Sequence, residues 1–337
     1  MNTPKCSLKE TAGQIFVVGM NGSGTGVLVK SLNQHPNLYA FPGETKILPY
    51  YLQNLNKFGD LNKDDNFRKL WDKIRKDFVF TAWNGGVDVP LPDSWLAGPR
   101  NIPSVFDGVF GFFAKREGKI RWCEKTPMHV LHLPLLKAQF PEAKFLHIIR
   151  DGRDAAASFN RRWNYRPEMT VYRWRNALRT ARVSGLSLPD DCYFELRYEE
   201  LVREPEHSLR QVCEFIGETF HQQMLQPAWP DGRVRLASGF VSNSGNWKTY
   251  FNPEMICRLE DIAGKTLRDN GYEVSSAAQD NDPPGFVRKY WVFCDRARMV
   301  TQLFKSALRN PRQGLLKSMG RLMGQLSKAL RQFMSQK

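Results

Sequence analysis

The sequence has no hydrophobic run long enough to cross a membrane. Its apolar stretches are short, such as FVVG at 16–19, whereas a membrane-spanning helix needs about 20 apolar residues. The first ten residues, MNTPKCSLKE, hold no apolar segment followed by a cleavage site, so no secretory signal is expected. These absences predict a cytoplasmic protein.

Cysteine is sparse, and its spacing excludes the common metal and redox motifs. No two of the cysteines have CxxC spacing, which fits reduced, buried thiols in a cytosolic protein. The sequence also shows no cluster of His, Cys and Asp with metal-ligand spacing, so we expect no metal cofactor. The six cysteines stand at positions 6, 123, 192, 213, 257 and 294.

Acidic residues are almost absent from one end of the chain. Residues 285–337 contain twelve lysines and arginines against the single acid Asp295, a net charge of +11. Because the whole chain carries +15, the other 284 residues carry only +4. A mildly basic body with no recognisable nucleic-acid-binding motif does not predict binding to DNA or RNA. The basic end therefore needs its own explanation.

The chain does contain an alternation of strand and helix patterns. Hydrophobic residues make up 42% and charged residues 25% of its 337 residues, an ordinary globular composition. Alternation of this kind predicts an α/β fold in which helices cover both faces of a parallel sheet. The expected strands are 14–19, 144–149 and 191–196, and the expected helices are 27–34, 128–139, 155–163, 205–216 and 253–269.

The expected domain organisation has three parts. Residues 1–273 form one α/β domain, and its insertion at 60–118 is expected to line the acceptor pocket, because residues 80–115 are irregular and rich in aromatic residues. Residues 274–286 (VSSAAQDNDPPGF) have the composition of a flexible linker. Residues 287–337 form a basic helical tail. The tryptophans expected in the pocket wall are Trp71, Trp83 and Trp95.

Apolar residues of the tail recur at helical spacing, and basic residues lie among them, a pattern that predicts an amphipathic helix. One interpretation is a peripheral contact with anionic lipid at a membrane surface. The other is packing of the apolar stripe against the body, or against a second copy of the chain in a homo-oligomer. The apolar residues are Leu315, Leu316, Met319, Leu322, Met323, Leu326, Leu330, Phe333 and Met334, and the basic ones are Lys317, Arg321, Lys328 and Arg331.

A glycine-rich loop, GMNGSGTG at 19–26, connects the first expected strand to the first helix. Backbone N–H groups at such a turn bind anions, and the helix dipole adds to the attraction. A plain tight turn is the alternative explanation. The loop is not a Walker A motif, because no Lys followed by Ser or Thr comes after its last glycine, which argues against a standard kinase or ATPase.

A second candidate anion site lies in KFLHIIRDGRDAAASFNRRW at 144–163. Arg150 follows the expected strand, and Ser158 and Arg162 lie on the helix after it, where charge-assisted hydrogen bonds could hold a phosphate. The alternative is a helix with ordinary solvated charges.

Together these segments resemble the sulfotransferases that use 3′-phosphoadenosine 5′-phosphosulfate (PAPS). The resemblance runs in order over residues 14–273 and skips the insertion. Its cofactor and catalytic segments are most similar to those of tyrosylprotein-type and bacterial sulfotransferases. It implies a P-loop-like α/β fold, PAPS as the cofactor, and sulfuryl transfer to a hydroxyl or amine. The matching segments are GMNGSGTGVLVKSLNQHP, FPGETKILPYYL, WCEKTPMHVLHLPLLKAQFPEAKFLHIIRDGRDAAAS, YFELRYEELVREPEHSLRQVCEFIG and NWKTYFNPEMICRLEDIAGKTLRDNGY.

The resemblance implies which residues bind the cofactor. Arg150 and Ser158 fall on the positions that bind the 3′-phosphate, and Arg162 matches a further phosphate contact. Tyr198 falls on a tyrosine near the nucleotide. The residues expected on the 5′-phosphosulfate are Gly22, Ser23, Gly24, Thr25 and Gly26.

The resemblance also implies two catalytic residues. Glu44 falls on the general base of the tyrosylprotein enzymes, and Lys125 falls on their catalytic lysine. The chemistry agrees, because a carboxylate can take the acceptor's proton and an ammonium group can neutralise charge on the leaving oxygen. Without the resemblance, Glu44 would be taken for a helix N-terminal acid and Lys125 for a surface lysine.

The loop departs from the family's usual pattern at two positions. Gly22 replaces a basic residue and Gly26 replaces a threonine, so one cation is missing, which Lys46 or Lys125 is expected to supply. Late in the chain, Lys248 is expected to replace another basic residue. The alternative function is a catalytically degenerate relative that binds nucleotide or a partner. The acceptor stays open between a glycan, a lipid, a phenol and a protein.

Overall fold

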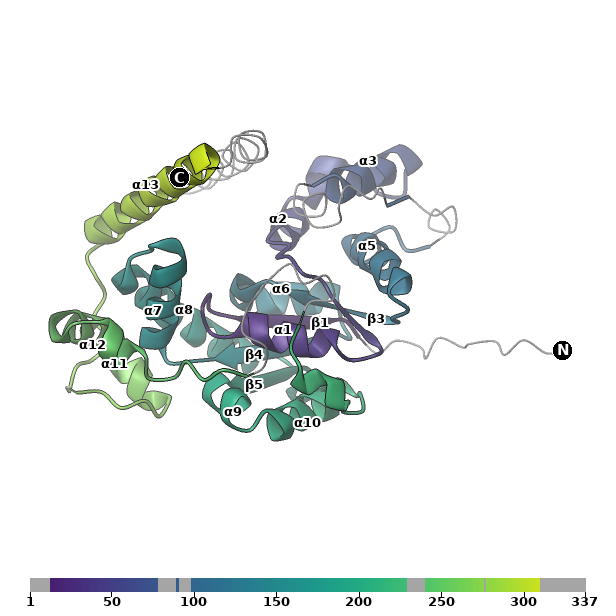
Figure 1. Cartoon of the computed structure of the whole chain (residues 1–337). Coiled ribbons are helices and arrows are strands. Elements are labelled where there is room, and N and C mark those ends of the chain that lie inside the picture. Colours follow the sequence, from purple (N-terminus) through teal and green to yellow (C-terminus); the bar gives the residue numbers. More distant parts are fainter. Residues whose placement is uncertain (1–12, 78–88, 91–97, 229–239, 276, 310–337) are drawn as a thin grey trace. The chain divides into compact units, whose positions relative to one another are not determined.

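The computed structural model describes residues 13–77, 89–90, 98–228, 240–275 and 277–309, and side chains up to residue 298. Figure 1 shows the chain coloured along its sequence. The described residues divide into two compact units. The first takes its residues from Met1–Asp154 and Trp174–Gly245, and the second from Ala155–Arg173 and Asn246–Lys337. The predicted Trp83, Trp95 and residues 310–337 lie outside the described part of the chain.

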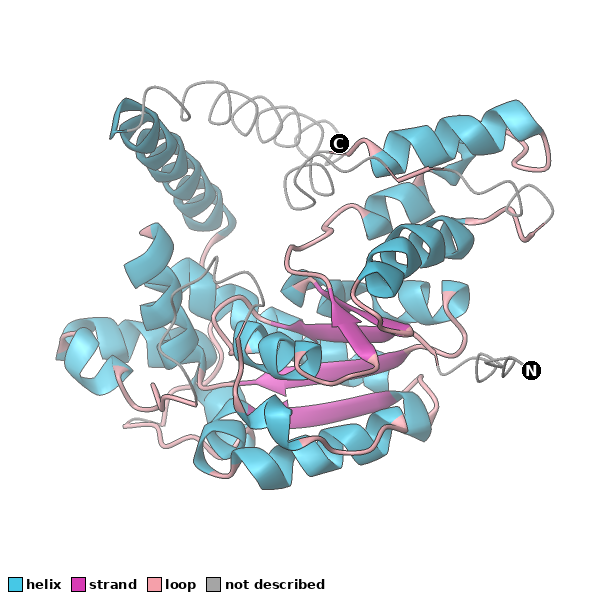
Figure 2. Ribbon diagram, turned by 45° about the vertical axis from the view of Figure 1, so that its right-hand side comes forward, coloured by secondary structure: helices cyan, strands magenta, loops and turns pink. Residues whose placement is uncertain are grey.

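A parallel sheet, drawn in magenta in Figure 2, forms the centre of the first unit. Its five strands lie in the order β2-β3-β1-β4-β5. In register, Ile15 of β1 faces Cys123 on one side and Lys144 on the other. The fold prediction is therefore confirmed. The strands are β1 Ile15–Gly19, β2 Leu38–Ala40, β3 Arg121–Lys125, β4 Lys144–Ile149 and β5 Tyr193–Arg197.

Helices and 3₁₀ turns connect these strands. The α-helices of the first unit are α1 Thr25–Asn33, α2 Leu48–Gln53, α3 Asp64–Arg75, α5 Ile102–Arg116, α6 Leu133–Gln139, α9 Tyr198–Arg203 and α10 Pro205–Ile216. The 3₁₀ turns are η1 Leu55–Phe58, η3 Pro127–His132, η4 Asp190–Cys192 and η5 Gln222–Leu225. Both units contribute residues to α7 Gly152–Trp163 and α8 Pro167–Gly185.

Side chains alternate between the two faces of the sheet, as strand geometry requires. Ile15 and Val17 belong to a core cluster with residues of α1, α9 and α10. Phe16 and Val18 belong to the other cluster, which includes residues of α5, α6 and α8. Both faces are therefore covered, which explains why β1 and most of β4 are continuous apolar runs.

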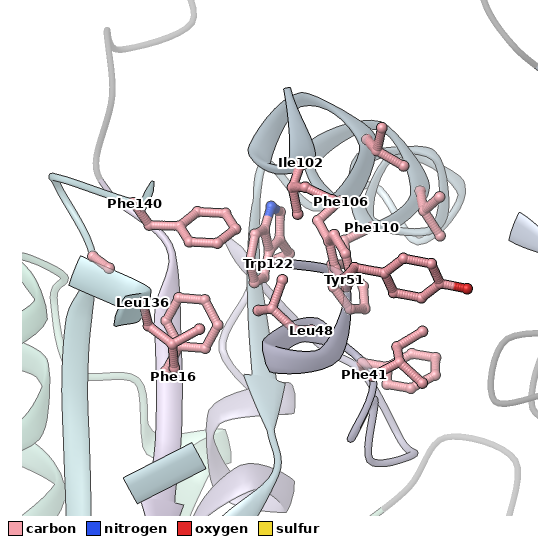
Figure 3. Close-up of a cluster of buried hydrophobic side chains, with 14 of the residues drawn as sticks. Phe16, Phe41, Leu48, Tyr51, Ile102, Phe106, Phe110, Trp122, Leu136 and Phe140 are labelled. Carbon is pink, nitrogen blue, oxygen red and sulfur yellow. The ribbon is translucent and has the colours of Figure 1, made fainter. Parts of the chain in front are cut away.

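The second of these clusters is built largely from aromatic rings (Figure 3). The Trp122 ring lies 5.6 Å from that of Phe16 and 4.7 Å from that of Phe110, measured between centroids. Its Nε1 donates to the Asp107 carboxylate at 2.9 Å, which satisfies the buried indole N–H. This cluster fixes β3 against α5 and so positions the end of β3.

One sequence expectation in this region needs correction. Irregular structure was expected throughout 80–115, but α5 occupies Ile102–Arg116, because its apolar residues recur at helical spacing and Asn101 caps its first turn by accepting from the Ser104 N–H. Trp71 is buried in the aromatic core cluster, and the role of the insertion in an acceptor pocket stays a prediction.

A single helix was expected over 128–139, but a 3₁₀ turn, η3, precedes α6 there. Pro134 causes the division, since a proline is tolerated in the first turn of a helix but not in its interior. The helices expected at 205–216 and 253–269 are confirmed by α10 and α12.

The regular secondary structure in the described residues of the second unit consists of helices. Its remaining helices are α11 Trp247–Tyr250, α12 Pro253–Asp269 and α13 Gly285–Arg309. The segment expected to be a linker contacts α12, because the Asp280 carboxylate accepts from the Thr266 N–H at 3.0 Å. None of the helices within the described residues is both long enough and apolar enough to cross a membrane.

Candidate functional site

The predicted site residues of the first unit follow the carboxyl ends of its strands. The glycine loop follows β1, Lys125 ends β3, Arg150 follows β4 and Tyr198 follows β5. Because all pairings in the sheet are parallel, these ends share one edge. In the strand order, β2 and β3 lie on one side of β1, whereas β4 and β5 lie on the other. Open α/β sheets bind ligands at the point where the strand order reverses in this way.

The glycine loop takes a backbone shape that requires glycine. Gly22 and Gly24 have φ angles of 92° and 98°, in the left-handed region. A Cβ on Gly24 would lie 2.3 Å from Cδ2 of Tyr198, so no other residue fits there without displacing the ring. At Gly26 a Cβ would meet no described atom within 4 Å, so Gly26 is not required by packing.

Several polar groups of the loop have no partner in the described chain. The Ser23 hydroxyl and the Asn21 amide oxygen are buried and form no hydrogen bond. No side chain caps α1, and the first N–H groups of a helix have no partner within it. Thr25 and Gly26 begin this helix. The loop therefore offers donors to an anion.

Arg150 stands beside this loop as a buried cation, 4% exposed. Its guanidinium donates to the carbonyl oxygens of Gly22 at 2.9 Å and Asn243 at 2.6 Å, and it lies 4.4 Å from the centre of the Tyr198 ring. Its Nε is buried with no partner, and no carboxylate among the described residues forms an ion pair with it. The Glu199 carboxylate interacts with it electrostatically without forming an ion pair. Because a buried charge without a counter-ion in contact is costly, the arrangement favours an anionic ligand such as a phosphate.

Glu44 lies between two lysines at the end of β3. Its carboxylate is 2.8 Å from Nζ of Lys125 and 2.7 Å from Nζ of Lys46. Burial alone would raise the pKa of Glu44, but the two ammonium groups outweigh it and lower the pKa to about 2. The structure thus brings together the two predicted catalytic residues and Lys46.

A second carboxylate, Glu124, anchors this group and was not predicted from the sequence. It is fully buried and accepts from the backbone N–H of Thr45 at 3.1 Å and from the Thr45 hydroxyl at 3.0 Å. The Thr126 hydroxyl donates to the same oxygen at 2.5 Å. Nδ1 of His129 lies 3.2 Å from the other oxygen, within ion-pair distance but not aligned for a hydrogen bond.

These contacts position the catalytic pair, because Glu44 precedes Thr45 and Lys125 lies between Glu124 and Thr126. Burial would raise the pKa of Glu124, but His129 and the hydrogen bonds lower it, so the carboxylate stays ionised. Lys46 has a left-handed φ of 50°, and its N–H donates to Thr126 Oγ1 at 3.3 Å. One feature of the sequence could have indicated Glu124. Side chains along a strand point alternately to opposite faces, so Glu124 and its neighbour Lys125 point in opposite directions.

The remaining predicted residues belong to the second unit. Arg162 donates to the Ser158 hydroxyl at 2.7 Å across one turn of α7. Lys248 is exposed and lies 3.5 Å from the Glu273 carboxylate. The two residues predicted for the 3′-phosphate are therefore divided, with Arg150 in the first unit and Ser158 in the second, and the roles of Ser158, Arg162 and Lys248 stay predictions.

Comparison with known proteins identifies the family of the chain. A family model described as "Sulfotransferase family" matches residues 14–222. A putative protein-tyrosine sulfotransferase of Caenorhabditis briggsae is 25% identical over 291 residues, which cover 79% of this chain and 91% of that protein. A similarly named protein of Caenorhabditis elegans is 29% identical over 231 residues, covering 58% and 88%.

Among solved structures, the sulfotransferase domain from the curacin biosynthetic pathway aligns with a TM-score of 0.53 at 19% identity, over 78% of this chain and 98% of that domain. This likeness concerns the fold. The family model spans more than half of the 337 residues, and it agrees with the resemblance carried by the glycine loop and the Arg150 segment. The chain belongs to the sulfotransferase family.

Proposed function

We propose that this sulfotransferase moves a sulfuryl group from PAPS to a hydroxyl or amine acceptor, with Glu44 as the general base. The observation that carries the proposal is Arg150, a buried guanidinium that forms no ion pair with a carboxylate among the described residues and interacts with Glu199 only electrostatically. It stands beside a loop whose Ser23 hydroxyl also lacks a partner. A ligand with several phosphate or sulfate groups would satisfy both.

The residues of the first unit fit such a cofactor. Backbone N–H groups of the loop and the hydroxyls of Ser23 and Thr25 would hold the phosphosulfate, and Arg150 would balance the negative charge. When bound, PAPS supplies the sulfuryl group that is transferred. The Tyr198 ring supports the Arg150 guanidinium by a cation–π contact.

Glu44 is poorly basic while both lysines contact it, because its pKa is held at about 2. A general base works best when its pKa is near the working pH. An anion that draws the Lys125 and Lys46 ammonium groups toward itself would weaken both contacts and raise the pKa of Glu44. We therefore infer that cofactor binding prepares the base.

In the transfer step, the acceptor oxygen or nitrogen forms the new bond to sulfur while its proton passes to Glu44. The bond between sulfur and the phosphate oxygen breaks, and that oxygen keeps the electron pair. Lys125 and Lys46 stabilise the charge on the departing oxygen. This role compensates for the glycine loop, whose residues 19–26 include no cationic side chain.

Cofactor binding is tested by thermal unfolding with 3′,5′-phosphoadenosine, compared with 5′-AMP and ATP. Ligand at 100 times its Kd should stabilise the protein by about 2.7 kcal/mol. We expect only the bisphosphate to do so, and Arg150→Ala to weaken its binding at least tenfold, since a hydrogen bond to a charged group is worth about 1.5–3 kcal/mol. Arg203→Ala, an exposed arginine of the same unit, is the matched control. Equal stabilisation of both variants would contradict the assignment.

A second candidate is a relative that binds nucleotide without transferring sulfate. Two observations favour it. The glycine loop contains no cationic side chain, and the ionised Glu44 carboxylate is already paired with Lys125. One measurement distinguishes the two candidates. With a mixture of phenol, glycan and peptide acceptors, a sulfotransferase releases 3′,5′-phosphoadenosine from PAPS, whereas a protein that only binds the nucleotide does not. Tight binding without turnover, together with a large gain of turnover in Gly22→Arg, would support the second candidate.

A further inference from the structure

The first turns of α13 present an exposed aromatic stripe. Phe286 is 76% exposed, Tyr290 57% and Phe293 70%. Their spacing of four and three residues places them on one face of the helix. Soluble proteins rarely expose several large apolar side chains together unless the surface binds something.

Exposed cations stand directly beside this stripe. Lys289 and Arg296 are exposed and lie seven residues apart, so they run parallel to the aromatic residues. The acid of this helix, Asp295, is buried and accepts from the Arg166 N–H at 2.9 Å. After Asp295 the sequence contains no further acidic residue up to its end at 337. The outward face of α13 is therefore aromatic and positive.

More arginines than acids surround Asp295, which strengthens the positive potential around α13. Arg166, Arg173 and Arg298 all lower the pKa of Asp295 electrostatically, against a larger rise caused by burial. One carboxylate thus faces three guanidinium groups. The Arg166 guanidinium also lies 5.5 Å from the centre of the Tyr290 ring, and its Nε is buried without a partner in the described chain.

We propose that α13 docks on an anionic membrane surface. Phe286, Tyr290 and Phe293 would enter the boundary between headgroups and acyl chains, while Lys289 and Arg296 contact lipid phosphates. Such a helix lies in the membrane plane, in keeping with the finding that no described helix could cross a bilayer. The surface is distinct from the proposed active site and does not depend on it.

Charge decides between this occupant and a second copy of the chain. A symmetric dimer through α13 would place the same basic face on both sides, and facing like charges oppose association. An anionic lipid surface satisfies the cations and the aromatic residues at once. The attraction of a basic residue to such a surface is about fivefold in binding per charge.

The test is co-sedimentation of the full chain with vesicles of phosphatidylcholine alone and of phosphatidylcholine with a quarter phosphatidylserine. We expect pelleting with the anionic vesicles only, weakened by salt. The triple variant F286S/Y290S/F293S should bind at least tenfold more weakly, and K289E/R296E at least 25-fold. The matched control is V183S/L186S, which removes two exposed apolar residues elsewhere.

Three outcomes would overturn the proposal. The wild-type chain could fail to pellet with anionic vesicles, or both α13 variants could pellet as it does, which would place lipid binding elsewhere. Size-exclusion chromatography could instead show a dimer that the triple variant dissolves, which would make a second copy the occupant. An unchanged thermal unfolding midpoint and circular dichroism spectrum in both variants would show that they remain folded.

Discussion

Two charged groups at the carboxyl edge of the sheet, Arg150 and the Glu44–Lys125–Lys46 cluster, differ in how their charges are satisfied. The Arg150 guanidinium bonds to carbonyl oxygens and pairs with no described carboxylate. The Glu44 carboxylate already has two ammonium partners. Each group has one more cation than its ion pairs neutralise, but only Arg150 has no described carboxylate at ion-pair distance, since Glu199 acts on it electrostatically alone.

The difference suggests an order of events. Arg150 is ready for an anion before any ligand arrives, because binding it breaks no ion pair. Glu44 must first lose part of its contact with the lysines before it can accept a proton. The comparison therefore predicts that cofactor binding and catalysis respond to different substitutions.

The largest effect is expected from Glu44→Gln. Turnover should fall by about 10²- to 10⁴-fold, the usual contribution of a general base, while stabilisation by 3′,5′-phosphoadenosine persists. Single-turnover sulfate transfer and thermal unfolding measure the two properties separately. Glu206→Gln, an exposed glutamate, serves as control. Transfer within tenfold of the wild type would remove Glu44 from the role of base.

Gly24→Ala should instead impair cofactor binding through Arg150, while leaving the Glu44 cluster unchanged. The new Cβ would meet the Tyr198 ring at 2.3 Å, and the residue would keep a φ of 98°. We expect a loss of about 1–3 kcal/mol of stability and weaker binding of the bisphosphate, because the ring supports Arg150. Chemical denaturation and ligand titration check both effects. Gly26→Ala meets no neighbour, so equal losses in the two variants would contradict the packing argument.

Lys46→Met should have a smaller effect, on the pH dependence of transfer. One of the two cations that lower the pKa of Glu44 is removed, so that pKa should rise from about 2. The acidic limb of the pH profile of kcat/KM should shift toward neutral pH, accompanied by a severalfold lower kcat. Lys46→Arg should restore the wild-type profile. A profile that does not move would show that Lys46 has no influence on Glu44.

The smallest effect concerns stability at low pH. The pKa values of Glu44 and Glu124 are both below the ordinary value in the folded chain. Their ionised forms therefore stabilise the fold above about pH 4.5. The contribution of Glu44 is lost as the pH falls toward 2, and that of Glu124 is lost as the pH falls through its own lowered pKa. Denaturation between pH 7 and 3 should show a shallower loss for Glu44→Gln than for the wild type, and parallel curves would contradict this linkage.

The sequence was sufficient for those parts of the fold that depend on local pattern. β4 was expected at 144–149 and found there, because KFLHII is a compact apolar run. β2 was missed, since its three residues are too few to show a period. β3 was missed because RWCEK carries charges whose partners are remote, as when Arg121 donates to the carbonyl oxygens of Gly13 and Ile216.

The site was predictable in its members but not in its pairing. Glu44 and Lys125 were identified by resemblance to a family, and their separation in sequence is 81 residues. Their contact depends on Glu124, whose partners Thr45 and His129 come from two different segments. A buried charge of this kind can be recognised only when the groups that compensate it are seen together.

The Asp295 carboxylate has a consequence for how the second unit unfolds. It satisfies the backbone N–H of Arg166 just before α8 begins, and it balances arginines from two helices. Melting α13 would leave that N–H group and those guanidinium groups without their acceptor. Residues 285–309 are therefore an integral part of the second unit. They should unfold together with α8, and a chain cut after residue 284 would expose an uncapped helix start amid unbalanced positive charge.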